Sequence, residues 1–250
     1  MLSPAARNRQ KVLAALAAAN AASGTPAGKA AARPETGPEA SAYELLLAAL
    51  GADLARLKEI QSIEAKIALK AQLVAAYDHH VDATLAASAR HGAAVEDEIV
   101  ATMLLWRLDI GDYERALDLA AHVLRFGLAM PRHMQRKAPV VVAEEVAEAA
   151  LKADKTDQTF DLDVLDRTIA LTADHDMPDQ VRAKLYKARG RILIRTATEA
   201  SQSESAPAGA VAAARAGALQ ALQRAYELDR KCGVQKDIER LQTKVSAAQE

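Results

Sequence analysis

The most compact group of chemically competent side chains in this sequence is the acidic turn Asp174-His175-Asp176, which precedes Met177 and Pro178. Two carboxylates so close together could hold a divalent cation such as Mg²⁺, which takes oxygen ligands and can activate water against a phosphate. The commoner origin of such a run is an acidic loop in front of a helix, whose first turn favours negative charge. Asp174 and Asp176 are therefore weak candidates for catalysis.

Two further pairs of carboxylates have spacings that a metal ion could use. Asp109 and Asp112 flank Gly111, whereas Glu145 and Glu148 lie three residues apart in a predicted helix. Helix capping or turn formation explains the first pair better than metal binding does. A solvated helix face explains the second pair better. We therefore expect no metal site, and Mg²⁺ would be required only if the chain were a nuclease.

Signals for other cofactors are weak. The segment GTPAGKA over 24–30 superficially resembles a phosphate-binding loop, but it is one residue short and ends in Lys-Ala, so the hydroxyl that binds Mg²⁺ is missing. The six histidines have no spacing to cysteine partners that suits zinc. We expect no cofactor.

Basic side chains gather in three places where they could pair with nucleic-acid phosphates. The first group lies near the start of the chain and consists of Arg7, Arg9 and Lys11. The second lies in the Pro-bounded loop 130–139 and consists of Arg132, His133, Arg136 and Lys137. The third lies on the helix predicted over 179–198 and consists of Arg182, Lys184, Lys187, Arg189, Arg191 and Arg195. An ordinary solvated face is the competing interpretation of each group, and no helix-turn-helix is recognisable.

The overall charge restricts how these groups could act. The chain has 32 Lys and Arg against 33 Asp and Glu, a net charge of -1 and a pI of about 6.6. These values exclude a strongly basic DNA-binding protein that acts as a single chain. DNA binding would have to come from a local basic patch, or from weak patches repeated in an oligomer.

The composition predicts an all-α fold. Hydrophobic residues make up 50% of the 250 residues but aromatic ones only 3%, and much of the apolar share is alanine, which favours helices. Sheet cores usually need more β-branched and aromatic residues. No apolar run approaches the ~20 residues of a membrane span. The single cysteine, Cys232, excludes an internal disulfide and fits a cytoplasmic protein.

Four regions are predicted along the chain. Residues 1–22 read as a basic N-terminal helix, 23–40 as a flexible linker rich in Gly and Pro, 41–92 as oligomerisation helices, and 93–250 as a helical C-terminal domain. In the third region, apolar residues recur at intervals of three and four from Leu47 to Val81, which is typical of a coiled coil or a long helical hairpin.

Short helices follow in the C-terminal domain. We predict them over 96–108, 113–126, 140–153, 162–173, 179–198, 210–226 and 237–248, with a second low-complexity loop over 201–209. Trp106 lies on an apolar helix face and is expected in the core. The segments 111–127 and 218–233 place Ala and Leu as tetratricopeptide-like helix pairs do, without a complete consensus. These patterns predict short antiparallel helix pairs.

Several long blocks resemble a known family in their order and spacing. They are SPAARNRQKVLAA (3–15), MLLWRLDIGDYERALDLAAHVLRFGLAMP (103–131), VVAEEVAEAALKA (141–153), LTADHDMPDQVRAKLYKARGRIL (171–193) and ALQRAYELDRKCGVQKDIERL (221–241). The chain is similar in these blocks to the terminase small subunit, also called the terminase endonuclease subunit, of cos-packaging tailed bacteriophages.

The resemblance implies a function in the cytoplasm of the host cell. Small terminase subunits bind double-stranded phage DNA at the packaging site, recruit the large subunit that carries the ATPase, and form homo-oligomers that are commonly rings. Two alternatives stay open: an Mg²⁺-dependent endonuclease that cuts cos DNA itself, and a helical protein–protein scaffold. Since no nuclease or ATPase motif is recognisable, a DNA-binding subunit without catalysis is the favoured interpretation.

Overall fold

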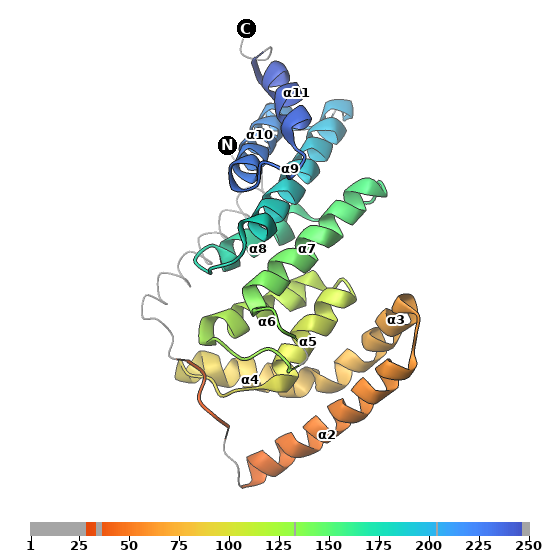
Figure 1. Ribbon diagram of the computed structural model, residues 1–250, viewed down its shortest axis with the longest axis vertical. Helices are drawn as coiled ribbons and strands as arrows, with labels where there is room; N and C mark the ends of the chain where they lie inside the picture. Colours follow the sequence, from red (N-terminus) through yellow and green to blue (C-terminus); the bar gives the residue numbers. More distant parts are fainter. Residues whose placement is uncertain (1–28, 34–36, 133, 204, 247–250) are drawn as a thin grey trace.

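The computed structural model describes residues 29–33, 37–132, 134–203 and 205–246 (Figure 1). Over these residues the fold is all-α, as the composition predicts, and their one strand-like pairing is a single bridge between Ala31 and Val95. The helices are α2 (Pro38–Glu59), α3 (Ile63–Leu73), α4 (Asp78–His91), α5 (Glu98–Asp109), α6 (Tyr113–Phe126), α7 (Ala138–Lys155), α8 (Leu162–Thr172), α9 (Asp179–Gln202), α10 (Ala210–Leu228) and α11 (Gln235–Ser246), with a 3₁₀ turn η1 (Val74–Tyr77). The helix predicted over 1–22 lies outside the described residues.

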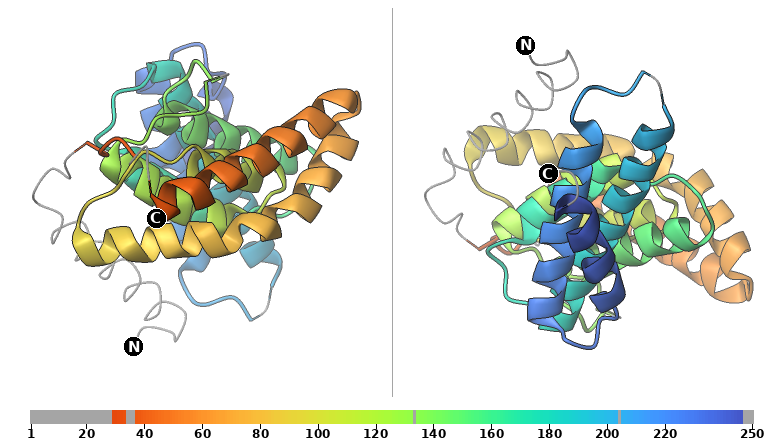
Figure 2. Two further views of the ribbon diagram at one scale, coloured as in Figure 1. Left: turned by 90° about the horizontal axis from the view of Figure 1, so that it is seen from below. Right: turned by 90° about the horizontal axis from the view of Figure 1, so that it is seen from above.

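The molecule is elongated, with a hairpin of helices at one end. Figures 1 and 2 show α2 as one arm of this hairpin and the line of α3, η1 and α4 as the other. The arms join at residues 60–62, where Ile60 is extended and the Ser62 side chain accepts a hydrogen bond from the Ala65 amide to cap α3. A hairpin of helices was one of the two forms predicted for this region, whereas the coiled coil stays a prediction.

The hairpin buries its apolar seam only in part. Leu57, Val74 and Tyr77 belong to the core, and the Tyr77 hydroxyl donates to a carboxylate oxygen of Asp53 at 2.8 Å, which ties η1 to α2. Ile63, however, is 76% exposed, and α3 has no buried residue. Because η1 and the break at 60–62 change the helical phase, the seam read from the sequence does not stay on one face.

A single large core joins the helices from α2 to the first half of α9. Trp106 lies in it at 3% exposure, as predicted, with Tyr77 packed edge-on against its ring at a centroid distance of 6.1 Å. Burying a large apolar side chain of this kind contributes roughly 1.5–3 kcal/mol. The helices α5 to α8 are thus held as one unit beside the hairpin.

A second, smaller core lies at the opposite end of the molecule. It is formed by Leu193 of α9, Leu222 of α10, and Val234, Ile238 and Leu241 in or before α11. The long helix α9 takes part in both cores and so connects the two ends (Figure 1).

Sequence periodicity located these helices well. The helix over 113–126 agrees at both ends with α6, whose start is capped by Asp112 and whose end is set by Gly127 at φ 61°. The loop predicted over 201–209 separates α9 from α10. The tetratricopeptide-like character of the helix pairs stays a prediction.

Two parts of the stretch expected as a flexible linker over 23–40 are ordered instead. The Ala30 amide donates to the Phe126 carbonyl at 2.8 Å, and Ala31 exchanges backbone hydrogen bonds with Ala94 and Glu96. Residues 38–40 already belong to α2. Such pairing requires acceptors and donors contributed by residues far along the chain, which the composition of the segment cannot reveal. None of the helices in the described ranges is both long and apolar enough to cross a membrane.

Candidate nucleic-acid interface

The basic loop between α6 and α7 is held in place at both of its ends. Gly127 ends α6, and the Ala129 amide then donates to the Glu96 side chain at 2.9 Å. At the other end, the Arg136 guanidinium forms an ion pair with Glu144 and approaches Glu145 at 3.8 Å. The loop therefore has a defined course over the surface of α7.

Within the described chain, the three predicted cations of this loop differ in their contacts. Arg136 is neutralised by the α7 carboxylates, with its side chain 46% exposed. Arg132 and Lys137 are both exposed, and neither forms an ion pair with a described residue. Lys137 precedes Pro139 at the start of α7. The loop thus presents two cations to solvent and uses the third to fix itself.

The acidic turn 174–176 lies beside this loop. A surface cavity of about 430 Å³ is lined by Arg136 and Lys137 from the loop and by His175 and Asp176 from the turn. The loop and the turn, both singled out in the sequence, thus share one cavity between α6, α7 and the start of α9.

The turn itself is held by a cation of α9. The Arg182 guanidinium donates to the His175 carbonyl at 2.7 Å and to the Thr172 carbonyl at the end of α8. Asp174 and Asp176 both remain exposed. Over the described residues, no group of three or more His, Cys, Asp or Glu side chains lies together so that it could hold a metal ion.

The third basic group is part of the internal framework of the protein. Each of its six side chains contacts a partner inside the chain, which favours a structural role for the cations of α9 over a DNA-binding face. Lys184 pairs with Glu148 at 2.8 Å and Glu144 at 3.2 Å, which raises the pKa of its ammonium group. The other contacts are Arg182 to His175, Lys187 to the Cys232 carbonyl, Arg189 to Asp166, Arg191 to Asp237, and Arg195 to Glu199 and the carbonyls of Asp157 and Gln158.

The remaining carboxylate candidates also have internal partners. Asp112 caps α6 through the Arg115 amide and pairs with Arg107, so the predicted capping role is confirmed. Asp109 pairs with Lys70 of α3. Glu145 is half-buried, and burial, followed by the charge of Asp109, raises the pKa of its carboxyl.

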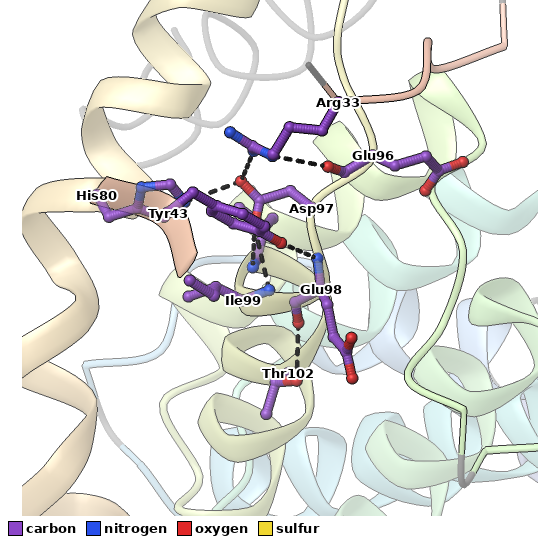
Figure 3. Close-up of polar contacts among 9 residues, drawn as sticks. Arg33, Tyr43, His80, Glu96, Asp97, Glu98, Ile99 and Thr102 are labelled. Atoms are coloured by element: carbon purple, nitrogen blue, oxygen red, sulfur yellow. Dashed lines mark hydrogen bonds and ion pairs between the residues drawn. The ribbon is translucent and has the colours of Figure 1, made fainter. Parts of the chain in front are cut away.

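A polar cluster that the sequence did not predict lies where the hairpin meets α5 (Figure 3). The Asp97 carboxylate is fully buried; one oxygen accepts from the amides of Ile99 and Val100, and caps α5. The other oxygen accepts from Arg33 at 2.6 Å and contacts His80 Nε2 at 2.8 Å. Four interactions therefore satisfy one buried charge, as burial requires.

Tyr43 of α2 completes this cluster. Its hydroxyl accepts a hydrogen bond from the Glu98 amide at 2.9 Å, and the Arg33 guanidinium lies 3.7 Å from the centre of its ring. Burial, with the charge of Asp97, raises the pKa of Tyr43 to about 12. The cluster thus joins the segment 29–33, α2, α4 and α5, and it acts as a structural junction.

The comparisons with known proteins decide the family. A model of the phage small terminase subunit family matches residues 47–180. The chain is also 38% identical over 244 residues to the protein named "Terminase, endonuclease subunit" of Escherichia phage P2, with 97% of this chain and 85% of that protein covered. This chain belongs to the phage small terminase subunit family.

A second relative in the family is more distant. The "Probable terminase, endonuclease subunit" of Haemophilus phage HP1 (strain HP1c1) is 24% identical over 159 residues, which cover 62% of this chain and 54% of that protein. No solved structure matches the chain. The family match over 47–180 contains the basic loop, the acidic turn and Asp97, whereas α10 and α11 lie beyond it.

Sequence reasoning missed the Asp97 cluster for a physical reason. Asp97 stands directly before an apolar helix, which is a signal for a capping residue. The other members of the cluster, Arg33, Tyr43 and His80, lie 64, 54 and 17 residues before Asp97, and only the fold of this terminase subunit brings them together.

Proposed function

We propose that this small terminase subunit binds viral DNA at the packaging (cos) site and recruits the large subunit to it, in the cytoplasm of the host cell. Its family membership supports a role in phage genome packaging. The contact with DNA is made by the loop cations Arg132, Arg136 and Lys137 and by the N-terminal group Arg7, Arg9 and Lys11.

The loop is assigned to DNA contact because two of its cations are free to pair with phosphates. Among the described residues of the loop, Arg132 and Lys137 are exposed and without an ion-pair partner, whereas the six cations of α9 are engaged inside the chain. Since affinity for a duplex comes largely from cations that displace counterions from phosphates, unengaged cations are the ones that can contribute. Arg136 has a second task, because its pairing with Glu144 fixes the loop.

The backbone contacts of the segment 29–33 support the N-terminal group as a second contact. Ala30 is hydrogen-bonded to Phe126, the last residue of α6, and the basic loop follows directly after that helix. The N-terminal segment is therefore attached next to the loop, so that both groups can act on the same stretch of DNA.

Assembly of several copies supplies the affinity that one near-neutral chain lacks. The hairpin region 41–92 is the proposed site of self-association, in a ring, because it carries Leu45 at 74% and Ile63 at 76% exposure. Association of copies through this region would remove these apolar side chains from water, which is favourable. Repetition of two or three cations per copy then raises the avidity for DNA.

Mobility shift of a duplex that carries the phage cos site tests this function. The wild type should bind it, and R132Q/K137Q should bind it roughly tenfold or more weakly, with a smaller dependence on salt. The matched control is K152Q/K155Q, which removes the same charge from exposed, unpaired positions of α7. If the wild type does not bind the duplex, or if the two variants lose DNA affinity equally, the loop is not the interface.

A second candidate function rests on the printed name of the phage P2 relative, an endonuclease subunit. Under this alternative the chain cuts cos DNA with Mg²⁺ held by Asp174 and Asp176. Incubating the purified protein with cos DNA and Mg²⁺ separates the two candidates. Cleavage by the wild type that D174A/D176A abolishes would establish the nuclease, and intact DNA in both reactions would leave the binding function.

A further inference from the structure

The closing helix α11 has two chemically different faces. Its inner face contributes Ile238 and Leu241 to the small core, at 9% and 5% exposure, and Asp237 pairs with Arg191 of α9 at 2.8 Å. Its outer face carries Lys236, Arg240 and Lys244. The helix is thus fixed to the body of the protein by one side only.

The three cations form a row along α11 that turns by about 40° at each step of four residues. Residues four apart share one helix face and are separated by about 6 Å along the axis. Lys236, Arg240 and Lys244 are all exposed, and none forms an ion pair or side-chain hydrogen bond with any described residue. Arg230 and Lys231, in the turn before α11, are exposed as well and extend the positive surface.

Few negative charges oppose this row. Asp237 is turned inward to Arg191, with its side chain 13% exposed, and Asp229 accepts a hydrogen bond from the Lys231 amide. Glu239 is the exposed carboxylate on the described part of α11. The outer face therefore has an excess of positive charge although the whole chain has a net charge of -1.

Helix stability does not account for the row. Like charges four residues apart destabilise a helix, and Lys236 in the first turn of α11 opposes the positive end of the helix dipole. Unlike the six cations of α9, the three of this row have no ion-pair partner among the described residues. An anionic ligand outside the protomer would compensate their charge.

The side chains around the row favour a phosphate backbone over a protein surface. Protein interfaces depend on large apolar or aromatic anchors, and the exposed ones among the described residues, Leu45, Ile63 and Ile67, all lie in the hairpin. Next to the row stand Gln235 and Gln242, exposed amides that can donate to phosphate oxygens. We propose that the outer face of α11 binds the backbone of duplex DNA without reading its sequence.

This inference rests on the proposed DNA-binding function and adds a second surface at the opposite end of the molecule from the hairpin (Figure 1). The loop with the N-terminal group, and the outer face of α11, would contribute differently to DNA binding. The loop lies within the family match over 47–180, whereas the N-terminal group and α11 lie outside it. Because phosphates are the same along any duplex, the α11 face would hold DNA of any sequence.

The test measures binding of the full chain to a DNA duplex of random sequence over a range of salt concentrations. K236Q/R240Q/K244Q should bind about tenfold or more weakly than the wild type, and the slope of log affinity against log salt should fall by about 0.9 for each lost phosphate contact. The charge-conserving variant K236R/R240K/K244R should bind as the wild type does. Equal helical content by circular dichroism verifies that the neutralised helix stays folded.

The control removes three other exposed cations without an ion-pair partner in the described chain, in R90Q/K152Q/K155Q, and should keep the wild-type slope. If the wild type binds cos DNA but the α11 variant and the control bind random DNA equally well, the inference is overturned while the proposed function stands. If the wild type binds no DNA at all, both fail. Loss of binding to the large subunit with unchanged DNA affinity would assign the face to a protein and also overturn the inference.

Discussion

At the scale of single residues, Asp97 differs from the other helix-capping aspartates in its degree of burial. It accepts from two backbone amides, as a capping residue does, but its second oxygen also binds Arg33 and His80 in an environment that excludes water. Asp161 caps α8 in the same way from an exposed position. Comparing Asp97 with Asp161 therefore separates the stability contributed by a helix cap from that contributed by a buried ion-pair network.

We predict that D97A lowers the free energy of unfolding by roughly 3–5 kcal/mol, since it leaves Arg33 and His80 without their shared anion. D161A should cost about 1 kcal/mol, the usual value of a lost cap. Chemical denaturation followed by circular dichroism measures both. Similar losses in the two variants would mean that the contacts of Asp97 with Arg33 and His80 add little.

His122, unlike Asp97, is a buried polar side chain with an unsatisfied ring nitrogen in the described structure. It is 7% exposed, and its Nε2 has no hydrogen-bond partner in the described structure. Burial, partly offset by the charge of Asp97, lowers the pKa of His122 below its ordinary value of about 6.5. The folded protein therefore keeps this imidazole neutral at a pH where the unfolded chain takes up a proton.

His122 makes the folded protein less stable at acidic pH than at neutral pH. A lowered folded-state pKa gives stability that is complete above about pH 6.5 and is lost as the pH falls through the folded-state value. We predict that H122L is as stable as the wild type at pH 7.5, or more stable, and loses less stability between pH 7 and pH 5. Thermal unfolding at a series of pH values measures this; parallel profiles of the two proteins would contradict it.

At the scale of elements, local sequence signals predicted the helices, whereas long-range contacts determine which side chains are paired and which lie together. The cap at Asp112 and the glycine at 127 fix both ends of α6 within the sequence itself. The sequence could not show that the cations of α9 are paired, because the partners Glu148, Asp166 and Asp237 come from three other helices. The acidic turn and the basic loop were both singled out, but their shared cavity depends on the packing of α9 against α7.

The contact of α9 with α10 depends on a glycine in the middle of a helix. A methyl group on Gly190 would lie 2.5 Å from Cδ2 of Leu222, which is itself fully buried. We predict that G190A destabilises the protein by about 1–2 kcal/mol, because crowding costs about 1–3 kcal/mol and the gain in helix propensity returns up to about 1.

Gly51 of α2 is the matched control for this substitution, since a methyl group there meets nothing within 4 Å. G51A should leave stability unchanged or raise it by about 0.5–1 kcal/mol. Urea unfolding of both variants provides the comparison. An increase in stability for G190A would show that α9 and α10 can separate without cost.

At the scale of the whole molecule, the large exposed apolar side chains of the described residues and the cation row of α11 lie far apart. The exposed large apolar side chains of the described chain lie in the hairpin of α2 and α3, whereas α11 at the other end carries an excess of cations. Figure 1 shows these regions at opposite ends of an elongated body. Under the proposed function, copies would associate through the hairpin and keep the α11 face free for DNA.

We therefore predict that L45E/I63E reduces the protein to smaller assemblies or single chains, because two charges in the apolar contact oppose association. Light scattering after size exclusion measures the mass, and mobility shift measures DNA affinity. Affinity should fall by tenfold or more, since a single copy loses the avidity of the assembly. The matched control A213E/A216E adds the same charge to exposed positions of α10 and should keep both the mass and the affinity of the wild type. An unchanged mass for L45E/I63E would remove the hairpin as the site of self-association, and a lower mass with full DNA affinity would show that one copy suffices to bind DNA.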